Sequence, residues 1–209
     1  MTYYEAKEFS SKVTSFCGRG EYPWIYKTIT TLPLKEEDLY VLEIGAFLGA
    51  GTVIMAAACD ERFKYNRGNW RVLSMDTFCT GIPGTTQFER EKPRKDYINT
   101  WMELMKLSGF YGTRTAPLIA DSKSYLPYLR QNKAAFIWVD GDHDDTAVED
   151  MRIGKELLAI GGVIACHDAR EERGVVRGIA EQLDADSRFE LCHPVIEYSE
   201  EFTAHRRIG

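Results

Sequence analysis

Short apolar runs that alternate with helix-like stretches are the feature that most constrains the fold of this chain. Five runs, at residues 40–44, 70–75, 116–120, 134–139 and 163–166, have the length and composition of strands. A stretch with helical spacing follows each of them, and residues 188–208 indicate two more strands with no helix between them. This alternation predicts an α/β fold with one doubly wound, mostly parallel sheet of seven strands, an antiparallel C-terminal strand and helices on both faces.

The length and charge of the chain narrow the class of protein. A chain of 209 residues suits one domain, so a helical segment over residues 1–38 is expected to belong to the same domain as residues 39–209. The net charge of −6 argues against a general nucleic-acid binder, because phosphate contacts favour basic surfaces. No apolar run approaches the roughly 20 residues that span a bilayer. Five cysteines without a C-x-x-C pair indicate a reducing compartment, so we expect a cytoplasmic protein.

The first strand ends in a glycine-rich turn over residues 43–49. Gly45 and Gly49 would let the backbone approach a ligand closely at the start of a helix. The dinucleotide-binding pattern does not fit, because Phe47 stands where its second glycine should be. Glu43 would be a poor neighbour for a pyrophosphate, so the turn favours a ligand without phosphates. The alternative is a plain turn in which Glu43 only orients local N–H groups.

Polar residues also follow the second and third strands. Asp76 ends the second strand, where an acid can accept both hydroxyls of a ribose. Asp121 and Ser122 follow the third strand and suit either the edge of an adenine or the cap of the next helix. In a parallel sheet these strand ends lie along one edge, so the residues are expected to face one ligand.

The fourth and fifth strands end in a dense group of carboxylates and imidazoles. Residues 140–145 read DGDHDD, and the fifth strand ends in His167 and Asp168. Because neighbouring strand ends converge, Asp140, His167 and Asp168 are candidates for a metal site. The alternative is that Asp168 caps the next helix and His167 bonds the backbone.

Four segments together resemble a known enzyme family. The run 41–49 (VLEIGAFLG) resembles the first motif of catechol O-methyltransferase-like enzymes, which use S-adenosylmethionine (SAM). The runs 136–143 (FIWVDGDH) and 161–168 (GGVIACHD) are similar to small class I methyltransferases related to macrocin and cephalosporin-pathway O-methyltransferases. The run 74–78 (SMDTF) matches the second acidic motif of that group. The resemblance extends from near residue 39 to near residue 170.

The resemblance implies a Rossmann-like, SAM-binding methyltransferase domain over residues 39–209 that methylates a hydroxyl group of a small molecule. The cofactor-binding residues that it implies are Glu43, Gly45, Ala46, Phe47, Gly49, Asp76, Thr77, Asp121, Ser122 and Asp140. Asp140, His167 and Asp168 match the positions of metal ligands, but His167 departs from the carboxylate or amide of that group. Imidazole suits Mg²⁺ poorly, so either another divalent cation is bound or none. A homodimer through the N-terminal helices is a further expectation.

Methyl transfer requires an aligned acceptor and removal of its proton. His143 is the predicted general base, because its unperturbed pKa lies near neutrality, and Asp142 is the second candidate. His143 could equally be a loop residue that fixes the turn. The loop 77–95, the helix start at Tyr97 and Trp101, and the terminal strands are the expected walls of the acceptor pocket. The rival functions are a SAM-binding regulatory protein, a nicotinamide-dependent oxidoreductase and a nucleic-acid methyltransferase.

Overall fold

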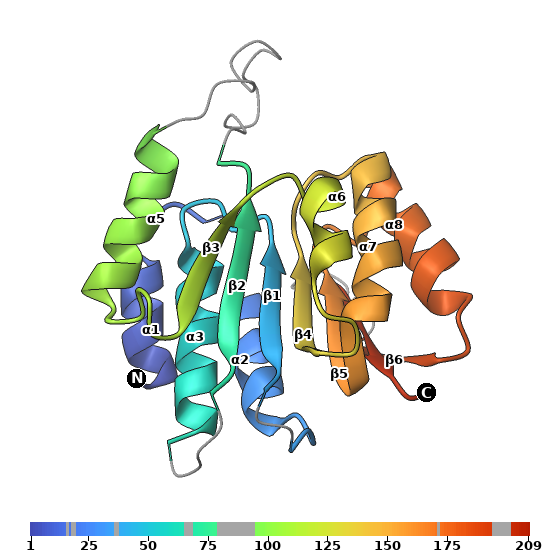
Figure 1. Ribbon diagram of the computed structural model, residues 1–209, viewed down its shortest axis with the longest axis horizontal. Helices are drawn as coiled ribbons and strands as arrows, with labels where there is room; N and C mark the ends of the chain where they lie inside the picture. The colour runs from blue at the N-terminus through green and yellow to red at the C-terminus, as the bar shows by residue number, and fades with distance from the viewer. Residues whose placement is uncertain are drawn as a thin grey trace.

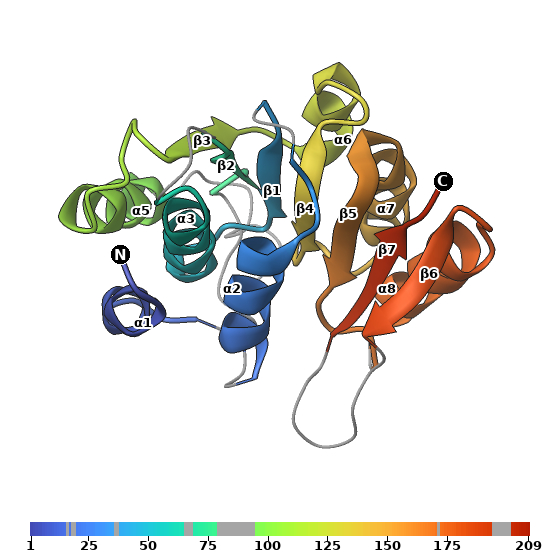
Figure 2. The ribbon, with the colours of Figure 1, turned by 90° about the horizontal axis from the view of Figure 1, so that it is seen from below.

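One central sheet organises the fold. The computed structural model describes residues 1–15, 17, 20–35, 38–64, 69–78, 95–170, 172–193 and 202–209. Within these residues, seven strands pair in the order β3-β2-β1-β4-β5-β7-β6, and helices lie on both faces (Figures 1 and 2). The strands are β1 (Tyr40–Ile44), β2 (Arg71–Asp76), β3 (Thr115–Ile119), β4 (Ala134–Val139), β5 (Leu158–Cys166), β6 (Phe189–His193) and β7 (Thr203–Arg207).

The direction of the strands confirms the predicted fold class. Strands β1 to β5 pair in parallel, whereas β7 runs antiparallel to both β5 and β6. The sheet is therefore a doubly wound α/β sheet with an antiparallel C-terminal strand. All six residues of β4 are buried, as expected for a central strand with a helix layer on each face.

Helices cover the two faces in two groups. The first face carries α1 (Tyr3–Ser10), α2 (Glu21–Thr31), α3 (Ala50–Arg62) and α5 (Lys95–Leu107), which share one apolar core (Figure 2). The other face carries α6 (Ser122–Tyr125), the 3₁₀ turn η1 (Leu126–Tyr128), α7 (Asp145–Leu157), α8 (Arg173–Gly178) and the π-helical turn η2 (Ile179–Asp184). No helix among the described residues is both long enough and apolar enough to cross a membrane.

The N-terminal helices pack into the core of the sheet. Ala6, Ile25 and Ile29 are fully buried and belong to the same apolar cluster as α3. Helix α1 begins at a reciprocal cap in which Thr2 and Glu5 bond each other's backbone N–H groups. The segment before residue 38 therefore contributes to the core instead of standing apart.

Strand β5 differs from its prediction. The sequence predicts a strand over residues 163–166, but β5 begins at Leu158 and runs through Gly161 and Gly162. The pairing of β4 with β5 is irregular before Val163, and Gly161 has a φ of 87°. A glycine in the left-handed region allows such a bulge without ending the strand.

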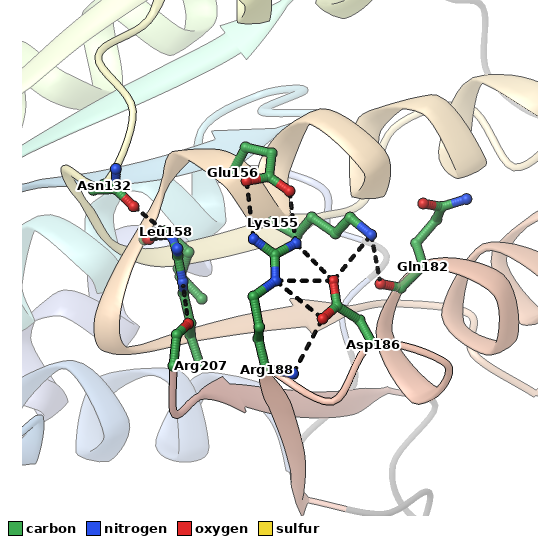
Figure 3. Close-up of polar contacts among 9 residues, drawn as sticks. Asn132, Lys155, Glu156, Leu158, Gln182, Asp186, Arg188 and Arg207 are labelled. Carbon is green, nitrogen blue, oxygen red and sulfur yellow. Dashed lines mark hydrogen bonds and ion pairs between the residues drawn. The ribbon is translucent and has the colours of Figure 1, made fainter.

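Ion pairs tie the C-terminal strands to the helix layer. Figure 3 shows Arg188, just before β6, between the carboxylates of Asp186 and Glu156, with nitrogen–oxygen distances of 2.7 Å to each. Arg207 on β7 donates to the side chain of Asn132 at 2.7 Å. These contacts fix the edge of the sheet that carries the antiparallel strand.

Candidate active site

The site lies where the order of the strands reverses. Strand β1 pairs with β2 on one side and β4 on the other, so the chain moves outward in both directions from this point. In doubly wound sheets, the crevice at the carboxyl ends of such strands is where ligands bind. The residues singled out in the sequence after β1, β2, β3, β4 and β5 all lie along this edge.

The glycine-rich turn after β1 is held by close backbone approach. Gly45 has a φ of 89°, and a Cβ atom on it would lie 1.9 Å from the carbonyl oxygen of Asp140. Gly49 has a φ of 91°, and its Cβ atom would lie 2.7 Å from the Trp101 ring. Both positions therefore exclude a side chain. Trp101 is fully buried beneath this turn, so the expectation that it lines an acceptor pocket is wrong.

Glu43 faces the interior instead of the open edge. Its side chain is 2% exposed and accepts a hydrogen bond from Thr52 on α3. Thr52 in turn accepts hydrogen bonds from Ser74 and Trp101, each at 3.1 Å. Burial raises the pKa of Glu43 to about 8, although hydrogen bonds from Thr52 and Ser74 oppose the shift. This geometry ties Glu43 to helix α3 through the hydroxyl of Thr52, and contact of Glu43 with a cofactor stays a prediction.

Asp76 ties two loops together at the end of β2. Its carboxylate accepts the backbone N–H of Phe47 at 2.8 Å and the backbone N–H of Phe78. Burial raises the pKa of Asp76, and these hydrogen bonds oppose the shift. Thr77 follows directly and is half-buried. Each oxygen of Asp76 keeps a lone pair for a further donor such as a ribose hydroxyl.

Asp121 and Ser122 lie at the start of α6. Asp121 is the N-cap residue, and its carboxylate accepts the N–H of Ser124 at 3.3 Å. Ser122 is 9% exposed. Capping therefore explains Asp121, whereas neither residue is shown to contact an adenine.

The ends of β4 and β5 bring together the three residues predicted to hold a metal. His167 Nδ1 lies 3.1 Å from Asp140 Oδ1 and 3.1 Å from Asp168 Oδ2. His143 joins them, with its Nε2 atom 3.0 Å from the same Asp168 oxygen. The residue before α8 is Glu172, which is its N-cap, so the alternative that Asp168 caps this helix is wrong.

His167 is enclosed by carboxylates on both sides of its ring. Its side chain is 4% exposed, and its Nε2 atom lies 3.2 Å from Glu21 of α2. Burial disfavours the charged imidazole, but contacts with Asp140, Asp168 and Glu21 outweigh it and raise the pKa of His167 to about 12. Burial alone would raise the pKa of Asp168, yet contacts with His167 and His143 lower it. These contacts favour the protonated form of the imidazole.

The two candidate bases lie in different surroundings. His143 is half-buried and has its Nε2 atom turned inward to Asp168. Asp142 is exposed.

A cavity next to His143 is lined by Asp145, Glu172, Arg173 and Arg177, among others. Another cavity, lined by Met1, Asp60 and Arg114, lies beside α1 and α3 at the start of β3, away from the site.

The donor atoms of this cluster fit a divalent cation. Ligand atoms of Asp140 and Asp168 lie within 4.8 Å of each other, and His167 Nδ1 lies 3.1 Å from an oxygen of each. His143 Nε2 and His167 Nδ1 are buried, and neither makes a well-directed hydrogen bond within the described residues, although carboxylate oxygens lie at ion-pair distance. Buried nitrogens that converge with carboxylate oxygens in this way are typical metal ligands.

Two residues of the cluster were missed in the sequence. Glu21 is 1% exposed and reaches His167, and the thiol of Cys17 lies 3.6 Å from Asp140 Oδ2. Both belong to the N-terminal segment, more than 100 positions away from Asp140 in the sequence. Local patterns carry no signal for such a contact. The expected pocket walls within residues 79–94 and 194–201 lie outside the described residues.

A comparison with protein families decides the class. A family model described as a methyltransferase domain matches residues 42–169, which is more than half of the chain. The chain belongs to this methyltransferase family. The matched region contains the glycine turn, Asp76, and the cluster of Asp140, His143, His167 and Asp168. No curated protein matches the sequence.

Solved structures show the same fold at low sequence identity. An O-methyltransferase from Bacillus cereus in complex with SAH is 14% identical, with a TM-score of 0.66 and coverage of 99% of this chain and 90% of that one. The O-methyltransferase TomG from Streptomyces achromogenes, in complex with SAM, is 13% identical, with a TM-score of 0.66 and coverage of 99% and 89%. An rRNA methylase from Streptococcus thermophilus is 12% identical, with a TM-score of 0.59 and coverage of 88% and 94%. The fold alone therefore does not indicate which kind of molecule accepts the methyl group.

Proposed function

We propose that this methyltransferase transfers the methyl group of SAM to a hydroxyl group of a small molecule in the cytoplasm. The observation that carries the proposal is the His143–Asp168 pair, which His167 links to Asp140 in a methyltransferase domain, where the backbone of Asp140 approaches the glycine turn. The structures of TomG with SAM and of the Bacillus enzyme with SAH support the choice of cofactor and of oxygen as the acceptor atom.

The turn after β1 provides the place for the methyl donor. Gly45 and Gly49 allow the backbone to approach the cofactor, and Asp76 fixes the loop at Phe47 while keeping lone pairs for a ribose. Asp140 approaches this turn with its backbone and His167 with its side chain, so it is the residue that we place next to the transferred methyl group. Transfer to an acceptor on the far side of Asp140 requires chiefly alignment, because the sulfonium is already activated.

His143 is the base that we assign to the acceptor hydroxyl. Its Nε2 atom faces Asp168, so an Nε2–H group directed at this carboxylate would leave the lone pair on Nδ1 to take the proton. Asp168 would then stabilise the imidazolium that forms. The charged lining of the cavity next to His143 favours a polar acceptor.

Asp140, His167 and Asp168 are the residues that would hold a divalent cation. A cation there would supply a Lewis acid for the acceptor hydroxyl. The side chains of this chain then have two tasks, which are to orient the acceptor and to accept its proton at His143.

Two measurements test the proposal. Calorimetric titration with SAM, with NAD as the control, is expected to show binding of SAM alone. Transfer of a labelled methyl group to a panel of hydroxyl compounds is then compared in the wild type, His143→Ala and His143→Gln. Both variants are expected to lose turnover by about 10²–10⁴-fold with unchanged affinity for SAM. Full turnover in His143→Ala would exclude this base, and binding of SAM without transfer to any acceptor would favour a regulatory protein.

A further inference from the structure

Glu21 is a buried carboxylate whose place the methyltransferase reaction does not explain. It is the first residue of α2, a helix that packs on the face of the sheet opposite α7. Only 1% of the residue is exposed. A buried carboxylate is costly unless it is paired, and one partner of Glu21 is His167, with 3.2 Å between Oε1 and Nε2.

The two ring nitrogens of His167 face different groups. Nε2 faces Glu21, whereas Nδ1 lies 3.1 Å from an oxygen of Asp140 and 3.1 Å from an oxygen of Asp168. A histidine that binds a metal through one nitrogen almost always donates the other N–H to a carboxylate, which fixes the tautomer and the orientation of the ring. Glu21, His167 and the two aspartates follow this pattern. Glu21 is the carboxylate at Nε2, and the aspartates lie on the Nδ1 side, where a metal would bind.

We propose that Glu21 is a positioning residue that holds the Nε2–H of His167 and so presents Nδ1, with Asp140 and Asp168, to a nitrogen-preferring divalent cation such as Mn²⁺ or Co²⁺ in preference to Mg²⁺. The proposal rests on the divalent cation in the proposed function. Imidazole is a softer ligand than oxygen, and Mg²⁺ prefers sites made of oxygen atoms alone.

Two observations support this assignment. His167 is 4% exposed and its Nε2 atom lies at ion-pair distance from Glu21, whereas Nδ1 makes no well-directed hydrogen bond within the described part of the chain. Nδ1 is therefore aimed at the aspartate oxygens without being satisfied by them. Glu21 also comes from a separate element, so it can orient the ring without occupying the side of the cluster that faces the cavity next to His143.

A different metal site would use the other side of the ring. The ligand atoms of Cys17, Glu21 and His167 also lie within 4.8 Å of one another. A cation there would be bound by the thiolate of Cys17. Cys17 and Glu21 supply one thiol and one carboxylate on this side of the ring, whereas Asp140 and Asp168 supply two carboxylates on the other side, each with an oxygen 3.1 Å from Nδ1. The oxygen-rich side of His167 is therefore the better site.

The test measures metal binding by the full chain without any acceptor. Calorimetry gives the affinities of the wild type for Mn²⁺, Co²⁺ and Mg²⁺, and the visible absorption of the Co²⁺ form reports its ligands. Glu21→Ala is expected to weaken binding of Mn²⁺ and Co²⁺ by about 10–100-fold, and Glu21→Gln by less. His167→Asp is expected to lower the preference for Co²⁺ over Mg²⁺, because it replaces an imidazole ligand with a carboxylate.

Asp184→Ala is the matched control, because it removes the carboxylate partner of another buried histidine, His205, at 2.7 Å. It is expected to leave the affinity for all three cations unchanged. Equal affinity for Mg²⁺ and Co²⁺ in the wild type, or unchanged binding in Glu21→Ala, would overturn the proposal. A sulfur-to-cobalt charge-transfer band that Cys17→Ser abolishes would also overturn it. Titration of the same variants with SAM reports separately whether the proposed cofactor binds.

Discussion

The close approach of Gly45 to the end of β4 predicts an unusually costly substitution. In Gly45→Ala, the new Cβ atom would lie 1.9 Å from the carbonyl oxygen of Asp140 and 2.8 Å from the backbone nitrogen of Gly141. Neither atom can move away easily, because the N–H of Asp140 donates to the carbonyl of Ile44 at 2.8 Å in the pairing of β1 with β4. The clash is therefore between two backbones that the sheet holds together.

The expected loss of stability has two parts. A residue with a Cβ atom in the left-handed region costs about 1–2 kcal/mol, and Gly45 has a φ of 89°. Forcing an additional methyl group into a packed interior costs about 1–3 kcal/mol. Gly45→Ala should therefore lower the free energy of unfolding by about 2–5 kcal/mol, the sum of these two ranges.

Gly109 provides the control for this prediction. It has a φ of 78°, but a Cβ atom on it would meet no atom within 4 Å. Gly109→Ala should therefore show only the cost of the left-handed backbone, about 1–2 kcal/mol. Urea unfolding followed by circular dichroism measures both variants. If Gly45→Ala is no less stable than Gly109→Ala, the close approach of the turn to Asp140 does not exist and the reasoning is refuted.

Two further predictions concern charges. Glu43 has a pKa of about 8 in the fold against an ordinary value of 4.5, so the folded state binds this proton more tightly than the unfolded state. The stabilisation that the proton gives is therefore lost as the pH rises between these two values. Glu43→Gln should flatten this decline in urea unfolding experiments, and an unchanged pH profile would contradict the buried carboxyl. Arg188→Met removes the ion pairs with Asp186 and Glu156 (Figure 3) and should cost about 1 kcal/mol. This loss should be smaller at high salt, because salt screens the ion pairs. Thermal unfolding at two salt concentrations measures it, and an equal loss at both would contradict an electrostatic origin.

The fold could be predicted because buried strands leave a local signal. Strands β1 and β4 are covered on both faces, so nearly every residue in them must be apolar, and that composition is visible without a structure. The parallel direction of the strands also places Asp76, Asp140 and His167 at one edge, because every such strand ends on the same side. The cluster at β4 and β5 follows from this rule alone.

The contacts of the N-terminal segment could not be predicted in the same way. Glu21 begins a helix whose apolar positions indicate only that one face is buried, and they do not indicate which strand end lies next to its first residue. Its contact with His167 depends on how α2 packs on the sheet. The early start of β5 could not be predicted for a related reason. A pair of glycines indicates a turn unless the strand that pairs with it is known.

The acids at the carboxyl edge are kept in separate chemical states by their partners. Glu43 is buried against hydroxyl groups, which favours its protonated form, whereas Asp76 accepts backbone N–H groups. Asp140, Asp168 and Glu21 instead converge on the ring of His167, and His143 adds a second imidazole beside Asp168. Carboxylates gathered in this way favour a cation beside the ring. A divalent metal and the sulfonium of a methyl donor both meet this demand, so the electrostatics of the cluster and the proposed reaction agree.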